Sequence, residues 1–149
     1  LVSASASIRQ ATPHDEDAVL ALMEGFCQSE GKTFAREQAQ AGLSPLLESD
    51  SHGVVLVAES ESVLAGYAVV CWSWSVEIGG AEACLDEIYV SSRDKGIGSA
   101  LIGATREVCV AHGMRRIFLE TEAINDDARR LYERHGYEAE DSIWMALTL

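Results

Sequence analysis

Residues able to hold a phosphate group and to move protons lie together between positions 84 and 137. The run Arg93-Asp94-Lys95-Gly96-Ile97-Gly98 places two cations beside two glycines, which let backbone amides approach an anion closely. Carboxylates and a phenol, which can accept or donate a proton, flank this run on both sides. The candidates for proton transfer are Asp86, Glu87, Glu120 and Tyr132. These residue types predict a phosphate-bearing ligand next to acid–base chemistry.

A strand and a helix must position the glycine run. Apolar residues between Leu85 and Val90 indicate a buried strand, and apolar residues recur at helical spacing from Ile97 to Cys109. Gly113 is placed to end this helix. The spacing R-x-x-G-x-G matches neither the P-loop, G-x-x-x-x-G-K-[ST], nor the dinucleotide-binding pattern G-x-G-x-x-G. The sequence therefore predicts a strand, a turn and a helix that bind phosphate through a motif different from these two.

The other elements follow a mixed α/β (α+β) pattern. Strands are predicted at residues 7–11, 54–58, 63–76, 82–90, 117–121 and 142–149. Helices are predicted from residue 13 to 31, more weakly over 34–47 with a break or kink near Gly42 and Pro45, and after the capping residue Asn125. We expect a mixed central sheet of about six to seven strands with about four helices.

Composition narrows the class of protein. A chain of 149 residues, 48% hydrophobic, has the length of one globular domain. We expect a disordered tail over residues 1–6 and one domain over 7–149. The net charge of −13 disfavours nucleic acid binding, and no apolar run reaches the roughly 18 residues of a membrane span. The acidity either aids solubility or steers a cationic amine. Four cysteines without C-x-x-C spacing favour free thiols in the cytoplasm over disulfides or a metal site.

The hairpin predicted over residues 54–76 carries two tryptophans. Trp72 and Trp74 are separated by one residue, so both indole rings should point to one face of the strand. Two roles are open, packing in the core or walling a pocket for an amine by cation–π contact. Gly66 in the same hairpin marks a bulge or a close approach of the backbone.

Two motifs resemble those of the GNAT superfamily of acetyl-CoA-dependent N-acetyltransferases. The first is R-x-x-G-x-G at 93–98, followed by Ser99-Ala100-Leu101. The second is N-x-x-A-x-x-L-Y-x-x-x-G-[FY] at 125–137, about 27 residues after the loop, as this family requires. The resemblance covers nearly the whole chain. It departs from the family in the short Ser91-Ser92 connection, which is about two residues shorter than usual.

The resemblance implies a site for acetyl-CoA. In GNAT proteins the strand before the loop splays from its neighbour and bonds the pantetheine arm, the loop amides take the pyrophosphate, and a tyrosine protonates the departing thiolate. The acid corresponds to Tyr132, and the first two helices would roof the acceptor site. The cofactor-binding residues implied are Ile88, Tyr89, Val90, Arg93, Asp94, Lys95, Gly96, Ile97, Gly98, Ser99, Ala100, Asn125, Ala128 and Tyr132. Phe26, Trp72 and Trp74 are expected to contact the acceptor.

Three acids compete for the role of general base. The strand that carries Asp86 resembles the corresponding strand of spermidine/spermine acetyltransferases, and Asp86 stands at the place of their catalytic glutamate. Glu87 matches the acid next to it. As neighbours on a strand, the two should face opposite sides. Glu120 stands where ribosomal-protein alanine acetyltransferases carry a catalytic glutamate. We rank Asp86 with Glu87 ahead of Glu120.

The resemblance therefore predicts acetyl transfer from acetyl-CoA to a primary amine by direct attack in a ternary complex. The acidic balance and the tryptophans favour a small cationic acceptor, polyamine-like or another amine. The alternatives are a protein N-terminal or lysine acetyltransferase and a non-catalytic acyl-CoA-binding module. We expect a cytoplasmic homodimer that uses no metal and binds neither nucleic acid nor membrane.

Overall fold

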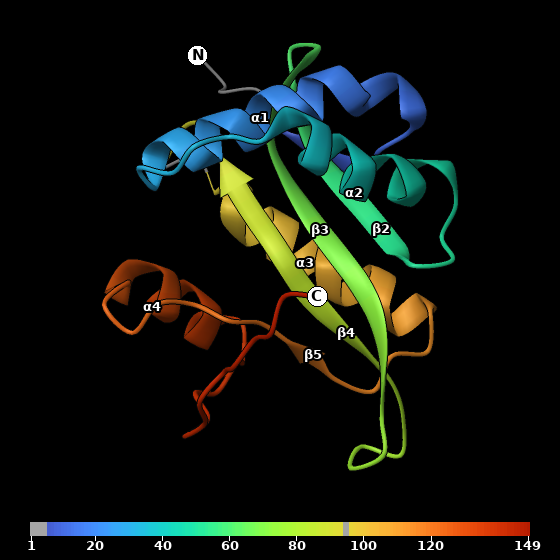
Figure 1. Ribbon diagram of the computed structural model, residues 1–149, viewed down its shortest axis with the longest axis vertical. Coiled ribbons are helices and arrows are strands. Elements are labelled where there is room, and N and C mark those ends of the chain that lie inside the picture. Colours follow the sequence, from blue (N-terminus) through green and yellow to red (C-terminus); the bar gives the residue numbers. More distant parts are fainter. Residues whose placement is uncertain (1–5, 94–95) are drawn as a thin grey trace.

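The computed structural model describes residues 6–93 and 96–149 (Figure 1). The expected tail, apart from Ala6, and two loop residues, Asp94 and Lys95, lie outside this part. The helices are η1 (Pro13–Asp15, a single 3-10 turn), α1 (Glu16–Ser29), α2 (Arg36–Glu48), α3 (Ile97–Ala111) and α4 (Asp126–Arg134). The strands are β1 (Ser7–Gln10), β2 (Gly53–Ser60), β3 (Val63–Ser75), β4 (Gly80–Val90) and β5 (Ile117–Phe118).

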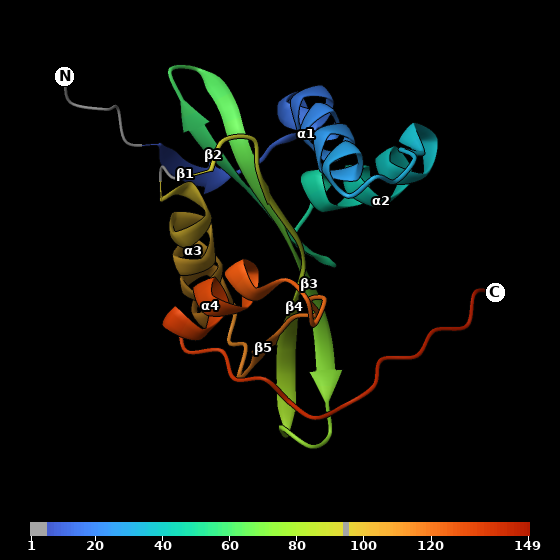
Figure 2. The same cartoon turned by 90° about the vertical axis from the view of Figure 1, so that its left-hand side faces the viewer.

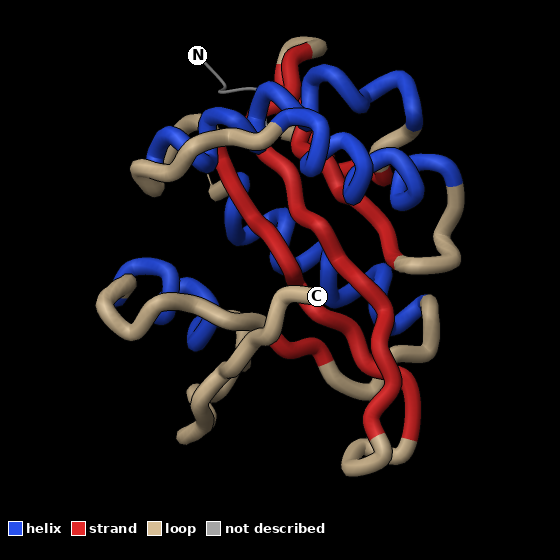
Figure 3. The backbone as a smooth tube through the Cα atoms, in the orientation of Figure 1, coloured by secondary structure: helices blue, strands red, loops and turns tan. Residues whose placement is uncertain are grey.

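The strands form one mixed sheet in the order β1-β2-β3-β4-β5, which follows the chain (Figure 3). The first four strands pair antiparallel, and β4 pairs with β5 in parallel. The parallel step requires a crossover, and α3 supplies it. The mixed α/β (α+β) fold predicted from the sequence is confirmed.

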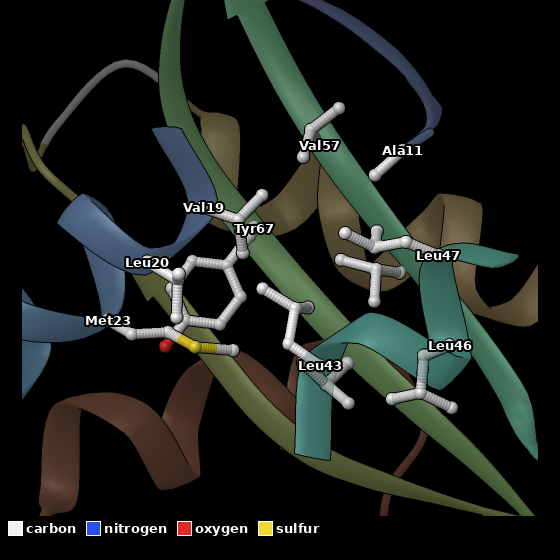
Figure 4. Close-up of a cluster of buried hydrophobic side chains, with 11 residues drawn as sticks. Ala11, Val19, Leu20, Met23, Leu43, Leu46, Leu47, Val57 and Tyr67 are labelled. Carbon is white, nitrogen blue, oxygen red and sulfur yellow. The ribbon is translucent and has the colours of Figure 1, made fainter. Parts of the chain in front are cut away.

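Helices cover both faces of the sheet, with α1 and α2 on one side and α3 and α4 on the other (Figure 2). Each face has its own apolar core because side chains alternate along the strands. On β3, Tyr67 and Val69 belong to the α1–α2 core, which Figure 4 shows, whereas Ala68 and Val70 belong to the α3 core. This alternation decides which strand residues can meet which cavity.

Gly66 confirms the predicted bulge and close approach. The register between β2 and β3 shifts at Ala58/Glu59, opposite Gly66. A Cβ on Gly66 would lie 2.8 Å from the carbonyl oxygen of Tyr89 on β4, so any larger residue would push the strands apart. In α2 the predicted break does not occur, since the helix runs through Gly42 and Pro45 to Glu48. Pro45 has no backbone N–H, so the carbonyl of Ala41 lacks its usual helical partner, yet the helix continues to Glu48.

The strand predicted over residues 142–149 is wrong, and the sheet has five strands among the described residues. Residues 138–149 have no regular structure, and Figure 2 shows them running away from the sheet. Strand propensity alone cannot form a strand, because each ladder needs a partner edge. No described segment of the chain supplies that partner to residues 142–149.

An ion-pair cluster joins the start of the chain to the sheet. Arg9 on β1 donates to both carboxylate oxygens of Asp15 at 2.8 Å, and its Nε donates to Glu59 on β2 at 2.8 Å. This bidentate pairing holds the pKa of Asp15 well below its usual range. The cluster therefore fixes the entry to η1 and α1 against β2. Across residues 6–93 and 96–149, no helix combines the length and apolar character needed to cross a membrane.

Candidate active site

The glycine turn leaves the first turn of α3 open to a ligand. Gly96 is the N-cap residue and has φ of 71°, a conformation that suits glycine. A Cβ on Gly96 would have no neighbour within 4 Å, and no side chain caps the helix among the described residues. The amides of Ile97, Gly98 and Ser99 are therefore free of a capping side chain in this part of the chain. Such a helix start suits a phosphate.

The strand before this turn splays from its neighbour, as the resemblance predicted. Only Ala83 and Cys84 of β4 pair with β5, opposite Ile117 and Phe118. From Leu85 to Val90, β4 keeps its ladder with β3, but within residues 6–93 and 96–149 no strand pairs with it on the β5 side. Figure 1 shows the two strands diverging. The unpaired edge, which includes Ile88, Tyr89 and Val90, offers backbone groups to an extended ligand.

Helix α4 is held at the start of α3. The Ser99 hydroxyl on α3 and His135 Nε2 just beyond α4 are hydrogen-bonded at 2.7 Å. A Cβ on Gly98 would touch Leu131 at 3.5 Å. Asn125 caps α4 as predicted, because its Oδ1 accepts a hydrogen bond from the amide of Ala128 at 3.2 Å. These contacts hold α4 so that Tyr132 lies at the cavity beside β4.

Tyr132 is half-buried and keeps its proton. Its ring packs against Tyr137 with centroids 5.9 Å apart. Burial raises the pKa of Tyr132 above the ordinary value of a phenol. The side chain is therefore a neutral hydrogen-bond donor at neutral pH, as a general acid must be.

A large cavity of about 1360 Å³ lies between β4, β5, α3 and α4, and we call it the β4–β5 cavity. Leu85 and Asp86 line it from β4, and Glu120 and Tyr132 line it from the other side. It therefore brings the first two residues of the splayed stretch of β4 to the same cavity as the candidate acid. Glu120 is exposed.

A second cavity of about 510 Å³, the α1–α2 cavity, lies on the opposite face of the sheet. Its walls are mainly apolar, and the acids among the described residues that line it are Asp86 and Glu87. The lining residues are Met23, Cys27, Thr33, Phe34, Ala35, Gln38, Ala39, Gly42, Leu43, Leu46, Val69, Cys71, Asp86 and Glu87. The predicted roof of α1 and α2 over a cavity is thus present.

Asp86 and Glu87 do not face opposite sides, and this prediction is corrected. Val69 pairs with Glu87 and Val70 pairs with Leu85, so Asp86 is an extra residue in β4. The resulting bulge breaks the alternation of side chains and brings both carboxylates to the α1–α2 cavity. Asp86 also lines the β4–β5 cavity. Asp86 at the bulge therefore borders both cavities.

The environments of the two carboxylates differ. Glu87 is half-buried, and burial raises the pKa of its carboxyl, with a further contribution from the charge of Asp86. Asp86 is exposed. Two adjacent acids that line one cavity attract a cation.

The two tryptophans point away from the α1–α2 cavity, which corrects their expected role as its walls. As predicted, both side chains point to the same face of β3. This is the face of the α3 core, in which Trp72 packs. It lies against His112, with ring centroids 4.8 Å apart, and its indole N–H donates to the carbonyl of Asp50 at 2.8 Å. The side chain of Trp74 is 73% exposed and therefore is not packed in a core. The sequence predicts alternation but does not say which face α1 and α2 cover.

Phe26 remains near the site without lining either cavity. Its ring packs against Tyr89 of β4, with centroids 5.7 Å apart. The residues that the sequence reasoning missed are Met23, Cys27, Phe34 and Gln38 from the helices, Cys71 from β3, and His135 after α4. Helical spacing marks Met23 as inward-facing, but no motif in the sequence assigns any of these residues to a site. Among the described residues, no group of three or more His, Cys, Asp or Glu could hold a metal ion.

Comparisons with known proteins agree with this geometry. The family model of the Acetyltransferase (GNAT) family matches residues 19–137. An uncharacterized N-acetyltransferase, YhfO of Bacillus subtilis (strain 168), is 29% identical over 134 residues and covers 89% of each chain. Integron cassette protein HFX_CASS3, from the mobile metagenome of Cole Harbour Salt Marsh, has a TM-score of 0.85 at 25% identity, over 95% of this chain and 90% of that one.

A more distant structure shares the fold. The aminoglycoside N-acetyltransferase AAC(6')-Iy, solved in complex with CoA, has a TM-score of 0.83 at 17% identity, over 97% of this chain and 95% of that one. The glycine turn, the splayed β4 and the family match lead to one conclusion. The chain belongs to the GNAT acetyltransferase family and is an acetyl-CoA-dependent N-acetyltransferase.

Proposed function

We propose that the protein acetylates the primary amine of a small cationic molecule held in the α1–α2 cavity. The observation that carries this proposal is the position of Asp86, which lines both cavities. A thioester on one side of the sheet and an amine on the other must meet for direct transfer. Among the described residues, Asp86 at the bulge is the one that borders both cavities.

Acetyl-CoA is assigned to the β4–β5 cavity and the glycine turn. The amides at the start of α3 bind its pyrophosphate. Arg93 precedes them in the sequence, as do Asp94 and Lys95, which lie outside the described residues. The free edge formed by Ile88, Tyr89 and Val90 bonds the pantetheine arm. Asn125 and Ala128, at the start of α4, border the same ligand. Ser99 serves a second purpose, because its hydroxyl is bonded to His135 and ties α4 to the loop.

The reaction needs a base and an acid. A protonated amine has no lone pair, so Asp86 accepts a proton from it, and the freed amine attacks the acetyl carbonyl. The new C–N bond forms as the C–S bond breaks, and Tyr132 donates its proton to the departing sulfur. We assign Asp86 as the base because it lines both cavities, and a general base must first of all lie within reach of the proton it accepts. Glu87 is assigned as the neighbouring carboxylate that attracts the cation. Glu120 ranks third because it lines only the β4–β5 cavity.

The walls of the α1–α2 cavity suggest the kind of amine. Its two carboxylates lie together, while Met23, Phe34, Leu43 and similar side chains make the rest mainly apolar. One cationic end on a compact apolar body fits this distribution better than a chain of several charges. A volume of about 510 Å³ is within the range of small-ligand sites. Phe26 lies on α1, the helix that carries Met23 and Cys27 of the cavity wall, and packs against Tyr89 of β4.

The test is a turnover screen in which release of CoA thiol is measured with acetyl-CoA and a panel of acceptors. The panel contains apolar monoamines, polyamines, aminoglycosides, amino acids and peptides with a free N-terminus or lysine. We expect kcat/KM to be highest for a compact monoamine. Highest activity on peptides would instead support a protein N-terminal or lysine acetyltransferase. CoA binding without turnover of any acceptor would support a non-catalytic acyl-CoA-binding module.

We propose further that the enzyme is cytoplasmic and homodimeric, with residues 7–149 as its single catalytic domain. Its four cysteines are all free, and Cys71 and Cys84 stand directly opposite each other on β3 and β4 without a disulfide. Unpaired thiols are typical of a reducing compartment.

A further inference from the structure

Two of the free cysteines face each other across neighbouring strands. Cys71 on β3 and Cys84 on β4 stand directly opposite one another in the antiparallel ladder. Side chains of directly opposed residues project to the same face of a sheet and lie close together. Cys27 and Cys109, in contrast, lie on the helices α1 and α3. The hairpin of β3 and β4 therefore pairs two thiols next to the bulge at Asp86.

The backbone at this pair has the geometry that a disulfide needs. The amides of Trp72 and Ala83, the next residues along the ladder, donate at 2.9 Å to carbonyls on the β2 side and the β5 side respectively. Because backbone groups alternate in direction along a strand, those of Cys71 and Cys84 point towards each other. In such a hydrogen-bonded pair the Cα atoms lie about 5.5 Å apart. Disulfides span Cα separations of about 4.4–6.8 Å, so the two sulfurs can be joined without a large movement of the backbone.

Each thiol lies where a small reagent can reach it. Both cysteines are half-buried, and Cys71 lines the α1–α2 cavity while Cys84 lines the β4–β5 cavity. Burial raises the pKa of both thiols, with a further contribution from the charge of Asp86, and the pKa of Cys84 reaches about 11. Because the thiolate is the form that attacks a disulfide, the pair reacts slowly at neutral pH and faster as the pH rises.

We propose that Cys71 and Cys84 are a modification site, at which a small organic disulfide produces a cross-strand disulfide that lowers acetyl transfer. The thiolate of one cysteine attacks the reagent RSSR, and a mixed disulfide forms as RS⁻ leaves. The thiolate of the second cysteine attacks the mixed disulfide, the bond between Cys71 and Cys84 forms, and a second RS⁻ leaves. Each RS⁻ takes up the proton that a cysteine has lost. The cysteine pair is thus oxidised, and the reagent is reduced to two thiols.

The bond acts on the acceptor side of the reaction, so its effect on turnover rests on the proposed function. A disulfide holds its sulfurs about 2.05 Å apart, so the side chain of Cys71 turns towards β4 and the wall of the α1–α2 cavity changes. The bond also ties β3 to β4 one ladder step from Val70 and Leu85, where the bulge at Asp86 begins. The proposed base therefore loses freedom to adjust to the amine. The glycine turn follows the other end of β4 and keeps its geometry.

The experiment treats the full chain with hydroxyethyl disulfide at mildly alkaline pH and then removes the reagent by gel filtration. This probe is uncharged, so the net charge of −13 does not repel it. Peptide mass spectrometry without reduction should find Cys71 joined to Cys84 with the loss of two hydrogen atoms. Single-turnover acetylation of the best acceptor, measured as acetylated amine, should fall by about tenfold or more, and dithiothreitol should restore it. CoA should still raise the melting temperature of the oxidised protein.

Two variants identify the thiols responsible, and each is compared with its own reduced form. The double variant Cys71→Ala/Cys84→Ala lacks the pair, so treatment should leave its turnover unchanged. The matched control is Cys27→Ala, because Cys27 also lines the α1–α2 cavity but lies on α1. This control keeps the pair and should lose turnover on treatment by the same factor as the parent.

Three results would overturn the proposal. They are a mixed disulfide that does not proceed to the bond between Cys71 and Cys84, a disulfide that involves Cys27 instead, and a complete bond between Cys71 and Cys84 with undiminished turnover. A reduced enzyme that acetylates no acceptor would refute the proposed function, and the effect on turnover would be refuted with it. The mass spectrum would still decide whether the pair forms its bond.

Discussion

Replacement of Asp86 by asparagine tests the assignment of the general base. The substitution keeps the size of the side chain and removes its capacity to accept a proton. General base catalysis contributes about 10²- to 10⁴-fold, which corresponds to about 3–5 kcal/mol in the activation barrier. Because Asp86 is exposed, the melting temperature should change little.

The loss should depend on pH in a defined way. An alkylamine with a pKa near 10.4 is neutral in roughly one molecule in 10⁴ at pH 6.4, and this fraction rises about tenfold per pH unit. Without its base, the variant relies on the amine that is already neutral. The ratio of parental to variant turnover should therefore be largest at low pH and shrink as the pH rises. The assay is thiol release in single turnovers with saturating acetyl-CoA, where chemistry limits the rate.

Glu87→Gln is the comparison variant. Burial and Asp86 raise the pKa of Glu87, so ionisation of Glu87 opposes folding. A raised pKa contributes stability that is present below the unfolded pKa of about 4.3 and is lost as pH rises through the folded pKa. Glu87→Gln should therefore raise the melting temperature at pH 7 and have little effect near pH 3. Its turnover should fall less than that of Asp86→Asn.

Two results would refute the reasoning about the base. One is parental turnover by Asp86→Asn across the pH range. The other is a loss that is the same at every pH, which would indicate a structural effect. A larger, pH-dependent loss in a Glu120→Gln enzyme would move the base to the β5 side of the β4–β5 cavity.

Three further predictions concern the acid, the coenzyme site and the ion-pair cluster. Tyr132→Phe keeps the ring packing, so coenzyme binding and folding should persist while single-turnover rates drop by about 10² to 10⁴; a parental rate would contradict its role as acid. Gly98→Asp places a negative charge at the phosphate site and should abolish the rise in melting temperature caused by CoA, whereas Gly98→Ala, whose Cβ would meet Leu131 at an ordinary 3.5 Å, should retain it. Asp15→Asn should lower the free energy of unfolding at pH 7 by about 1–2 kcal/mol, an amount reduced by the 39% exposure of Arg9. Since the pKa of Asp15 is lowered in the folded state, this difference in urea denaturation should fade below about pH 4, and a difference of the same size at pH 3 would be evidence against the ion pair.

Features that depend on neighbouring residues in the chain were predictable from the sequence. The glycine turn before α3, the Asn125 cap of α4 and the bulge or close approach at Gly66 all appear where the pattern placed them. Each rests on local backbone requirements, such as a positive φ at Gly96 or an acceptor for the Ala128 amide. The two family motifs are of the same local kind, and they were enough to identify the superfamily.

Features that depend on distant segments were decided by the tertiary structure. The register of β4 against β3 makes Asp86 a bulged residue, and no property of the sequence around Asp86 shows this. Trp72 faces α3 because α1 and α2 cover the other side of the sheet, a choice that alternation along one strand cannot make. Residues 142–149 have the composition of a strand, but no described segment of the chain pairs with them. A strand is a relation between two segments, so its existence, and the face to which each side chain points, are settled only when both segments are in place.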